Sequence, residues 1–259
     1  MADPDPWTGL KDAVLRGWFN HASGELFTGF PVGADDVVAD IGCGLGAYSE
    51  FCATHGARVI AVDIDPGRVE ATVRRLRGLT PPREIEAHVS ASNPLPIATG
   101  SVSRVVCLEV IEHVDSPQAL MAELARIGKP GALYLLACPD PGSEAIQQKL
   151  AAPGYFLKPH HIRILAHDEF ARLAEQAGLE VTNRSSHSFF WSLWLALFWA
   201  TGLDFDEASE RGFQGIRHPL LDHWTRTWQT LLDQPGGVRV KQALDDLLPK
   251  SQIIVARKP

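Results

Sequence analysis

The chain has 259 residues, of which 45% are hydrophobic and 21% are charged, and it carries a net charge of −7. This composition is ordinary for one globular α/β domain with additions, and the acidic balance argues against a large basic surface for nucleic acid. The four cysteines show neither a CxxC pair nor metal-finger spacing, and the acidic, Pro-rich start is not typical of a signal peptide. We therefore expect a protein of a reducing compartment, the cytoplasm.

The first predicted element is helical, and predicted strands and helices alternate after it. Residues 7–30 carry an apolar stripe at helical spacing, which predicts N-terminal helices. Strands are predicted at 37–41, 58–65, 84–90, 102–110 and 131–139, with helices at 47–56, 66–79 and 116–131 between them. Residues 167–186 add a helix ended by Gly178 and a sixth strand, and 251–259 form a seventh. This alternation predicts a doubly wound, Rossmann-like α/β fold with a seven-stranded, mostly parallel sheet and an antiparallel last strand.

About sixty residues separate the last two predicted strands, far more than the roughly 2–5 residues of a hairpin loop. We therefore expect three parts: N-terminal cap helices at 1–34, a core at 35–186 with 251–259, and a helical insertion at 187–250. The insertion contains FFWSLWLALFWA (189–200), which is too short to span a bilayer, since that takes ~20 residues. Three interpretations stay open for it: a buried helix or homo-oligomer contact, a cover over an apolar substrate, and a membrane-surface helix.

The most informative stretch is VVADIGCGLGAYS (37–49), an apolar strand followed by three glycines and a helix. Gly42, Gly44 and Gly46 permit a tight turn and close approach of a ligand to the backbone. Asp63 ends the next strand, about twenty residues after the first glycine, where a carboxylate can bind both hydroxyls of a ribose. These features suit a dinucleotide and S-adenosylmethionine equally.

Three observations favour S-adenosylmethionine. Asp40 stands directly before the loop, where a carboxylate would repel a pyrophosphate but attract an ammonium group. The glycine spacing is GxGxG, and the predicted sheet has no second βαβαβ half for a nicotinamide.

The motifs together resemble a known family. VADIGCGLG, AVDIDPGRV, NPLPIATGSVSRVVCLEVIEHV and HHIRILAHDEFARLAEQAGLEV look like successive motifs of class I S-adenosylmethionine-dependent methyltransferases, in particular the small-molecule ubiquinone and menaquinone group. The resemblance covers roughly residues 35–186 and is specific for the cofactor rather than the acceptor. It implies that Asp40 and the three glycines hold the methionine part and Asp63 the ribose. It also implies that Ile64 packs on the adenine, that the segment around Ser92 contacts the adenine edge, and that Leu108 and Glu109 line the methyl site.

The stretch Glu109-Val110-Ile111-Glu112-His113 places two carboxylates and an imidazole at the end of the fourth predicted strand. Methyl transfer to a hydroxyl needs a base, and we consider His113 and His161, with Glu109 beside them, as catalytic candidates. The same stretch resembles the divalent-metal site of small-RNA 2′-O-methyltransferases and some polyprenyl-catechol O-methyltransferases. Glu109, Glu112 and His113 are therefore candidate ligands for Mg²⁺, which would acidify a diol or catechol. A metal-free role and a structural role remain the alternatives.

The sequence thus predicts an S-adenosylmethionine-dependent methyltransferase that acts on a hydroxyl of an apolar, aromatic or glycosylated small molecule. Two alternatives stay open. One is metal-assisted methylation of a vicinal diol or catechol. The other is a non-catalytic S-adenosylmethionine-binding partner protein that uses the aromatic segment as an interface.

Overall fold

The computed structural model describes residues 8–80, 84–91 and 93–259, which form two compact units. The first comprises the described part of Met1–Arg16 with Pro139–Ile164 and Ser186–Gln252. The second comprises Gly17–Cys138, Leu165–Ser185 and Ile253–Pro259, less the residues outside the description. Each unit is therefore assembled from several separate stretches of chain.

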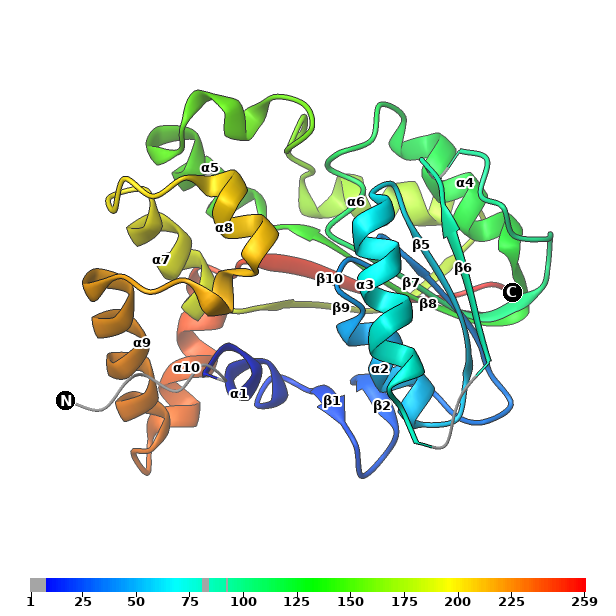
Figure 1. Cartoon of the computed structure of the whole chain (residues 1–259), viewed down its shortest axis with the longest axis horizontal. Helices are drawn as coiled ribbons and strands as arrows, with labels where there is room; N and C mark the ends of the chain where they lie inside the picture. The colour runs from blue at the N-terminus through cyan, green and yellow to red at the C-terminus, as the bar shows by residue number, and fades with distance from the viewer. Residues whose placement is uncertain (1–7, 81–83, 92) are drawn as a thin grey trace. The chain divides into compact units, whose positions relative to one another are not determined.

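The main sheet has seven strands in the order β6-β5-β4-β7-β8-β10-β9 (Figure 1). Its strands are β4 (Val37–Ile41), β5 (Arg58–Asp63), β6 (Ile85–Val89), β7 (Val102–Leu108), β8 (Gly128–Pro139), β9 (Glu180–His187) and β10 (Ser251–Arg257). The β6-β5-β4-β7-β8 part is parallel throughout. The predicted fold class is confirmed, with each predicted strand present within a few residues of its expected bounds.

The last strand runs against its neighbour β8. Backbone N–H groups pair Gly131 with Lys258 at one end, at 2.9 Å, and Asp140 with Lys250 at the other, at 2.9 Å. Pairs that advance along one strand while retreating along the other define antiparallel strands. This is the direction that the sequence predicted, but β10 lies between β8 and β9 rather than at the edge.

Helices cover both faces of the sheet because alternate strand residues point to opposite sides. Ala39 and Ile41 of β4 belong to the main hydrophobic cluster, together with side chains of α4 (Pro117–Ile127) and α6 (His167–Gln176). On the other face, Asp40 points to α2 (Ala47–Thr54), whose Ser49 hydroxyl bonds to it. Helix α3 (Pro66–Arg77) packs against α2 and β5.

Several helices begin with the same local signal, a capping side chain followed by proline. The cap accepts a backbone N–H of the first turn, and proline suits that turn because its missing N–H would have no helical partner. The pairs are Asp65-Pro66 for α3, Ser116-Pro117 for α4 and Asp140-Pro141 for α5 (Pro141–Leu150).

The prediction of helix over 7–30 is wrong for most of that range. The structure has helix α1 only at Thr8–Val14, and three short antiparallel strands follow: β1 (Trp18–Asn20), β2 (Glu25–Phe27) and β3 (Phe30–Pro31). The helical spacing was outweighed by Gly17, Gly24 and Gly29, which adopt positive φ angles of 100°, 73° and 84°. Glycine supplies such turns without steric cost, so the segment folds as a meander.

The first unit is helical and has its own aromatic core. It contains α1, α5, α7 (Phe189–Phe198), α8 (Phe205–Arg211), α9 (Pro219–Leu232) and α10 (Gly237–Leu247), with short 3₁₀ turns at Pro153–Phe156 and Phe213–Gly215. The core is made by buried side chains that include Tyr155, Phe190, Trp194, Phe198 and Trp228. Within this unit α7 is therefore a buried helix. Every helix within the described ranges is too short or too polar to cross a bilayer.

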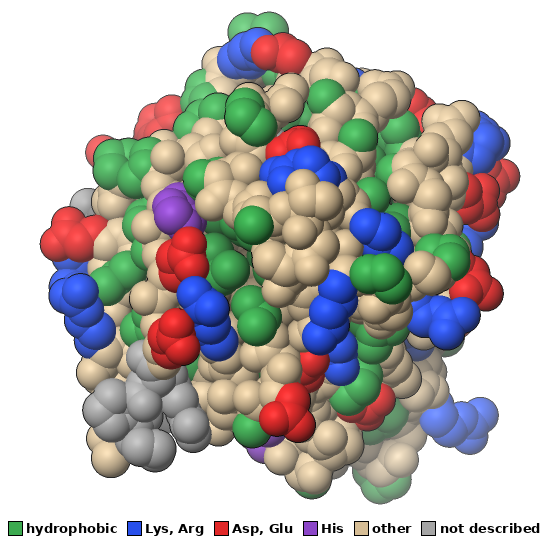
Figure 2. Space-filling view, turned by 90° about the vertical axis from the view of Figure 1, so that its right-hand side faces the viewer, with side chains coloured by type: hydrophobic (Ala, Val, Ile, Leu, Met, Phe, Trp, Pro, Cys, Tyr) green, Lys and Arg blue, Asp and Glu red, His purple; other side chains and the backbone are tan. Residues whose placement is uncertain are grey.

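On the face that Figure 2 shows, Lys and Arg side chains stand among Asp and Glu side chains. The basic run on α3 is partly neutralised in the same way: Arg74 pairs with Glu70 and Arg75 with Glu50, the latter at 2.7 Å. Exposed ion pairs of this kind contribute little to stability. Because these arginines are paired with acids, little positive field remains to attract a polyanion.

Candidate cofactor and catalytic site

The candidate site begins at the carboxyl ends of three adjacent strands in the second unit. Strand β4 lies between β5 and β7, and Ile41 is in register with Val62 and with Cys107. The register brings Asp63 and Leu108, the residues that follow those two partners, to the same edge of the sheet. Ligands of open α/β sheets bind at this edge.

The glycine loop between β4 and α2 is shaped by φ angles of 78° at Gly42 and 80° at Gly46, both in the left-handed region. A Cβ at Gly42 would overlap Val110, and a Cβ at Gly46 would crowd Thr72 at 2.8 Å. The sequence predicted that these glycines permit a tight turn and let a ligand approach the backbone. The structure shows that at these two positions the missing side chain makes room for the protein's own residues.

Asp63 lies beside the glycine loop and also accepts a hydrogen bond from its backbone. One carboxylate oxygen accepts the N–H of Gly44 at 2.9 Å and the other accepts the N–H of Asp65 at 3.0 Å. The residue is 6% exposed. An ionised carboxylate has about four acceptor sites, so the two backbone bonds leave capacity for ligand hydroxyls.

Asp40 is a buried carboxylate, 2% exposed, whose Oδ2 accepts the Ser49 hydroxyl at 2.6 Å. Burial raises the pKa of Asp40 to about 6, the Ser49 bond acts in the opposite direction, and the charge of Asp63 raises it further. Ionising this buried carboxylate costs free energy when no cation lies nearby. A cationic ligand group is therefore a suitable partner for it.

Two further predicted residues lie at the ends of strands in this unit. Ile64, directly after Asp63, leaves a large apolar side chain 70% exposed. Leu108 is 8% exposed at the end of β7, and Glu109 follows with φ 55°, an unusual angle for a residue that is not glycine. Strain of this kind is typical of functional sites. Ser92 lies outside the described residues.

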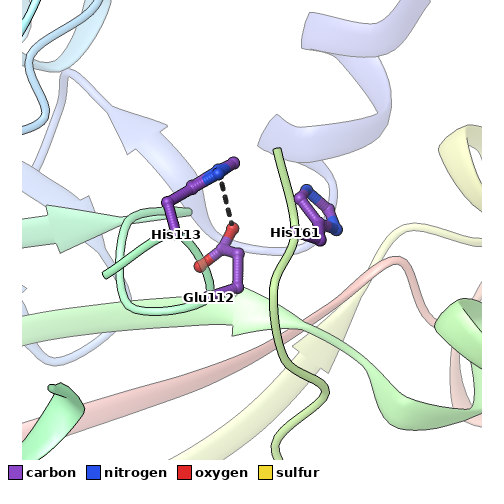
Figure 3. A group of neighbouring side chains, drawn as sticks. All are labelled: Glu112, His113 and His161. Carbon is purple, nitrogen blue, oxygen red and sulfur yellow. Dashed lines mark ion pairs between the residues drawn. The ribbon is translucent and has the colours of Figure 1, made fainter. Parts of the chain in front are cut away.

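Glu112 and His113 lie in the turn after β7, with 3.7 Å between Glu112 Oε1 and His113 Nε2 (Figure 3). The Glu112 side chain is 2% exposed and that of His113 is 33% exposed. A buried carboxylate beside a partly exposed imidazole can position a proton acceptor or supply two ligands to a divalent ion. The pair of Glu112 and His113 thus fits either role, and the assignment of a metal to Glu109, Glu112 and His113 stays a prediction.

His161 belongs to the first unit, where its ring is held by a buried acid. Its Nδ1 lies 2.8 Å from Glu144 Oε2, and the ring centroids of His161 and Tyr155 are 4.6 Å apart. The neighbouring His160 instead pairs with the exposed Asp206 at 2.9 Å. Sequence reasoning selected His161 but missed Glu144, because nothing in the sequence marks a glutamate seventeen residues away as its partner.

Ser49 and Thr72 were also missed. Ser49 bonds to Asp40, and the Thr72 hydroxyl donates to the Gly44 carbonyl at 2.9 Å. The position of Ser49 in the first turn of α2 was a signal that could have been used. The contact of Thr72 depends on how α3 packs on the loop and had no such signal.

A parallel sheet with a glycine loop after its first core strand and an acidic residue after its second defines a Rossmann-like nucleotide-binding domain. Residues 39–136 match a family model described as a methyltransferase domain. Over these residues the chain is similar to methyltransferase domains.

Two curated relatives have the same name, ubiquinone biosynthesis O-methyltransferase. The protein of Xanthomonas oryzae pv. oryzae is 40% identical over 101 residues, which are 39% of this chain and 41% of that protein. The protein of Aeromonas salmonicida is 27% identical over 179 residues, which are 66% of this chain and 71% of that protein. The stretch shared with the first relative thus spans less than half of its length.

A solved structure shows the same fold. The geranyl diphosphate C-methyltransferase of Streptomyces coelicolor A3(2) superimposes with a TM-score of 0.59 at 18% identity, covering 97% of this chain and 80% of that one. That structure contains Mg²⁺, geranyl diphosphate and S-adenosyl-L-homocysteine. At this identity the likeness concerns the fold.

The predicted contact of Asp63 with the ribose can be tested directly. We expect Asp63→Ala to weaken binding of S-adenosylhomocysteine by about 1–3 kcal/mol, since ribose hydroxyls would lose a charged partner. Isothermal titration calorimetry measures the change. Arg68→Ala, an exposed change on α3, is the matched control. Equal affinity of wild type and Asp63→Ala would contradict the ribose assignment.

Proposed function

We propose that the chain is an S-adenosylmethionine-dependent methyltransferase that transfers the methyl group to a hydroxyl of an apolar small molecule. The observation that carries the proposal is the buried Asp40 carboxylate beside a loop braced by Asp63. A buried, ionised carboxylate costs free energy when no cation neutralises it, and the ammonium group of S-adenosylmethionine supplies that cation. The name of the curated relatives, O-methyltransferase, supports a hydroxyl as the acceptor.

Each residue of the site then has a role that its geometry allows. Asp40 binds the ammonium group of the cofactor and Asp63 its ribose hydroxyls. The exposed Ile64 packs on the adenine, and Leu108 closes the site near the methyl group. The methyl group is already activated by the sulfonium, so much of the rate comes from alignment of donor and acceptor.

The acceptor hydroxyl must lose a proton, and this chain offers imidazoles for that step. His161, oriented by Glu144, and His113, beside Glu112, are the proposed bases. In the alternative function, Glu109, Glu112 and His113 hold a divalent cation that acidifies a diol or catechol. The close pair of Glu112 and His113 favours this candidate. We place the reaction in the cytoplasm, in keeping with four cysteines that are all buried thiols.

The function is tested by methyl-label transfer from S-adenosylmethionine into a fractionated cell extract, with and without EDTA. We expect label in a lipid or small-molecule fraction, and loss of the label with EDTA would support the metal-assisted alternative. Heat-denatured protein is the control. An extract that stays unlabelled, while S-adenosylhomocysteine still binds to the protein, would contradict turnover and favour a non-catalytic binding protein.

A further inference from the structure

Gly44 differs from the rest of the glycine loop in how its backbone is held. Its N–H donates to Asp63 Oδ2 at 2.9 Å, and its carbonyl accepts the Thr72 hydroxyl at 2.9 Å. The N–H of Cys43, by contrast, bonds to backbone, to the Val62 carbonyl at 3.0 Å. The two side-chain bonds restrain the peptide planes before and after Gly44, and thereby its φ and ψ angles.

Gly44 is also the glycine of this loop that the described residues leave open. A Cβ at Gly44 would meet no described atom within 4 Å, whereas at Gly42 and Gly46 it would meet neighbouring side chains. The φ angle of Gly44 is 53°, in the left-handed region. Glycine adopts positive and negative φ about equally readily, so bonds from Asp63 and Thr72, rather than an intrinsic preference, hold this conformation.

Thr72 is buried on α3, with 0% of its surface exposed. It shares the buried face of that helix with Val69, three residues before it, and Leu76, four residues after it. A helical threonine often returns its hydroxyl to a carbonyl of the preceding turn. The Thr72 hydroxyl instead crosses to Gly44, so α3 holds the loop through this bond.

We propose that Thr72 is a positioning residue for the cofactor: its hydroxyl fixes the Gly44 carbonyl, and thereby the backbone against which the methionine part of S-adenosylmethionine lies. The inference rests on the proposed function. Without this bond, one of the two restraints on Gly44 is lost. A ligand that requires one loop conformation must then order the loop as it binds, which lowers its affinity. Thr72 acts through Gly44 and needs no contact with the ligand.

Two substitutions separate the hydroxyl of Thr72 from its packing. Thr72→Val keeps the branched shape and removes the donor, whereas Thr72→Ser keeps the donor and removes a buried methyl group. Both should lower the free energy of unfolding, so stability does not distinguish them. We expect Thr72→Val to weaken S-adenosylhomocysteine binding about 3–10-fold, and Thr72→Ser to bind within about twofold of wild type. Calorimetric titration measures both affinities.

Thr54→Val is the matched control. It removes a threonine hydroxyl of α2 that donates to the Phe51 carbonyl at 2.7 Å, and it should leave the affinity unchanged. Equal affinities of Thr72→Val and wild type would overturn the proposal. Equal losses in Thr72→Val and Thr72→Ser would also overturn it, because the loss would then follow packing rather than the hydroxyl bond.

Hydrogen exchange tests the loop without any ligand. In ligand-free, ¹⁵N-labelled protein, we expect the Gly44 amide to exchange about 3–10-fold faster in Thr72→Val than in Thr72→Ser. Loss of the carbonyl bond should loosen the N–H bond to Asp63 as well. Equal exchange rates of this amide in the two variants would contradict the positioning role.

Methyl transfer distinguishes this inference from the proposed function. If Thr72→Val binds S-adenosylhomocysteine more weakly than wild type but wild type transfers no methyl group, the proposed reaction is contradicted and the role of Thr72 stands. If wild type transfers methyl groups and Thr72→Val binds as well as wild type, only the role of Thr72 is contradicted. A wild-type chain without affinity for S-adenosylhomocysteine would contradict both.

Discussion

The affinity of the chain for S-adenosylhomocysteine is expected to rise as the pH rises from 5 to 7. Burial raises the pKa of Asp40 to about 6, so the carboxylate is mostly protonated at pH 5 and mostly ionised at pH 7. The ligand's ammonium group interacts favourably with the ionised form only. We expect a gain of about tenfold in affinity over this range, which calorimetric titration at several pH values measures.

Asp40→Asn should remove this pH dependence and weaken binding at pH 7 by about 1.5–3 kcal/mol, the range for a hydrogen bond to a charged group. The matched control is Asp35→Asn, an exposed aspartate five residues earlier. A pH dependence that persists in Asp40→Asn would assign the titration to another group and contradict the role of Asp40.

The same substitution is expected to stabilise the ligand-free protein. The pKa of Asp40 in the folded protein lies above the ordinary aspartate pKa of 3.8, so folding favours the protonated form and stability falls as the pH rises from about 4 to about 6. A pKa shift of this size lowers the free energy of unfolding by about 3 kcal/mol as an upper bound. A neutral asparagine avoids this cost. Urea unfolding at pH 7 is expected to show that ligand-free Asp40→Asn is more stable than the wild-type chain, although the variant binds the cofactor less well.

The second large effect concerns a buried ion network in the first unit. Lys241 on α10 is 1% exposed and pairs with Asp12 of α1, at 3.1 Å, and with Asp245 of its own helix. Asp12 also accepts the Trp228 indole N–H at 2.9 Å and the Ser188 hydroxyl at 2.8 Å. Burial raises the pKa of Asp12, and the ammonium of Lys241 is the main influence against that shift.

We expect Lys241→Met to lower the free energy of unfolding by about 3–5 kcal/mol, because it leaves two buried carboxylates without their cation. The loss should shrink as the pH is lowered, since a protonated Asp12 carries no charge. Urea unfolding followed by tryptophan fluorescence reports on this unit, whose core contains Trp194 and Trp228.

Lys149→Met, at an exposed position on α5, is the control for loss of a lysine. The triple change Asp12→Asn, Lys241→Met and Asp245→Asn removes all the charges together and should recover a large part of the stability. A Lys241→Met variant within 1 kcal/mol of wild type would show that the network contributes little.

The sequence by itself determined the α/β class, the glycine loop and the acids at the ends of two strands. These are local signals: buried parallel strands are short apolar runs, and capping residues with proline mark helix starts such as Asp65-Pro66. Local spacing also misled, as at 7–30, where turn-forming glycines prevailed over an apolar stripe that fits a helix as well as packed strands.

Only the tertiary structure decided which distant residues meet. Glu144 reaches His161, Asp12 reaches Lys241, and β10 pairs between two strands that precede it. The glycines of the loop show the same limit: their pattern was visible, but the crowding of Gly42 by Val110 was not. Side chains far apart in the chain carry no common periodicity, so their contacts follow from how whole elements pack to bury apolar surface.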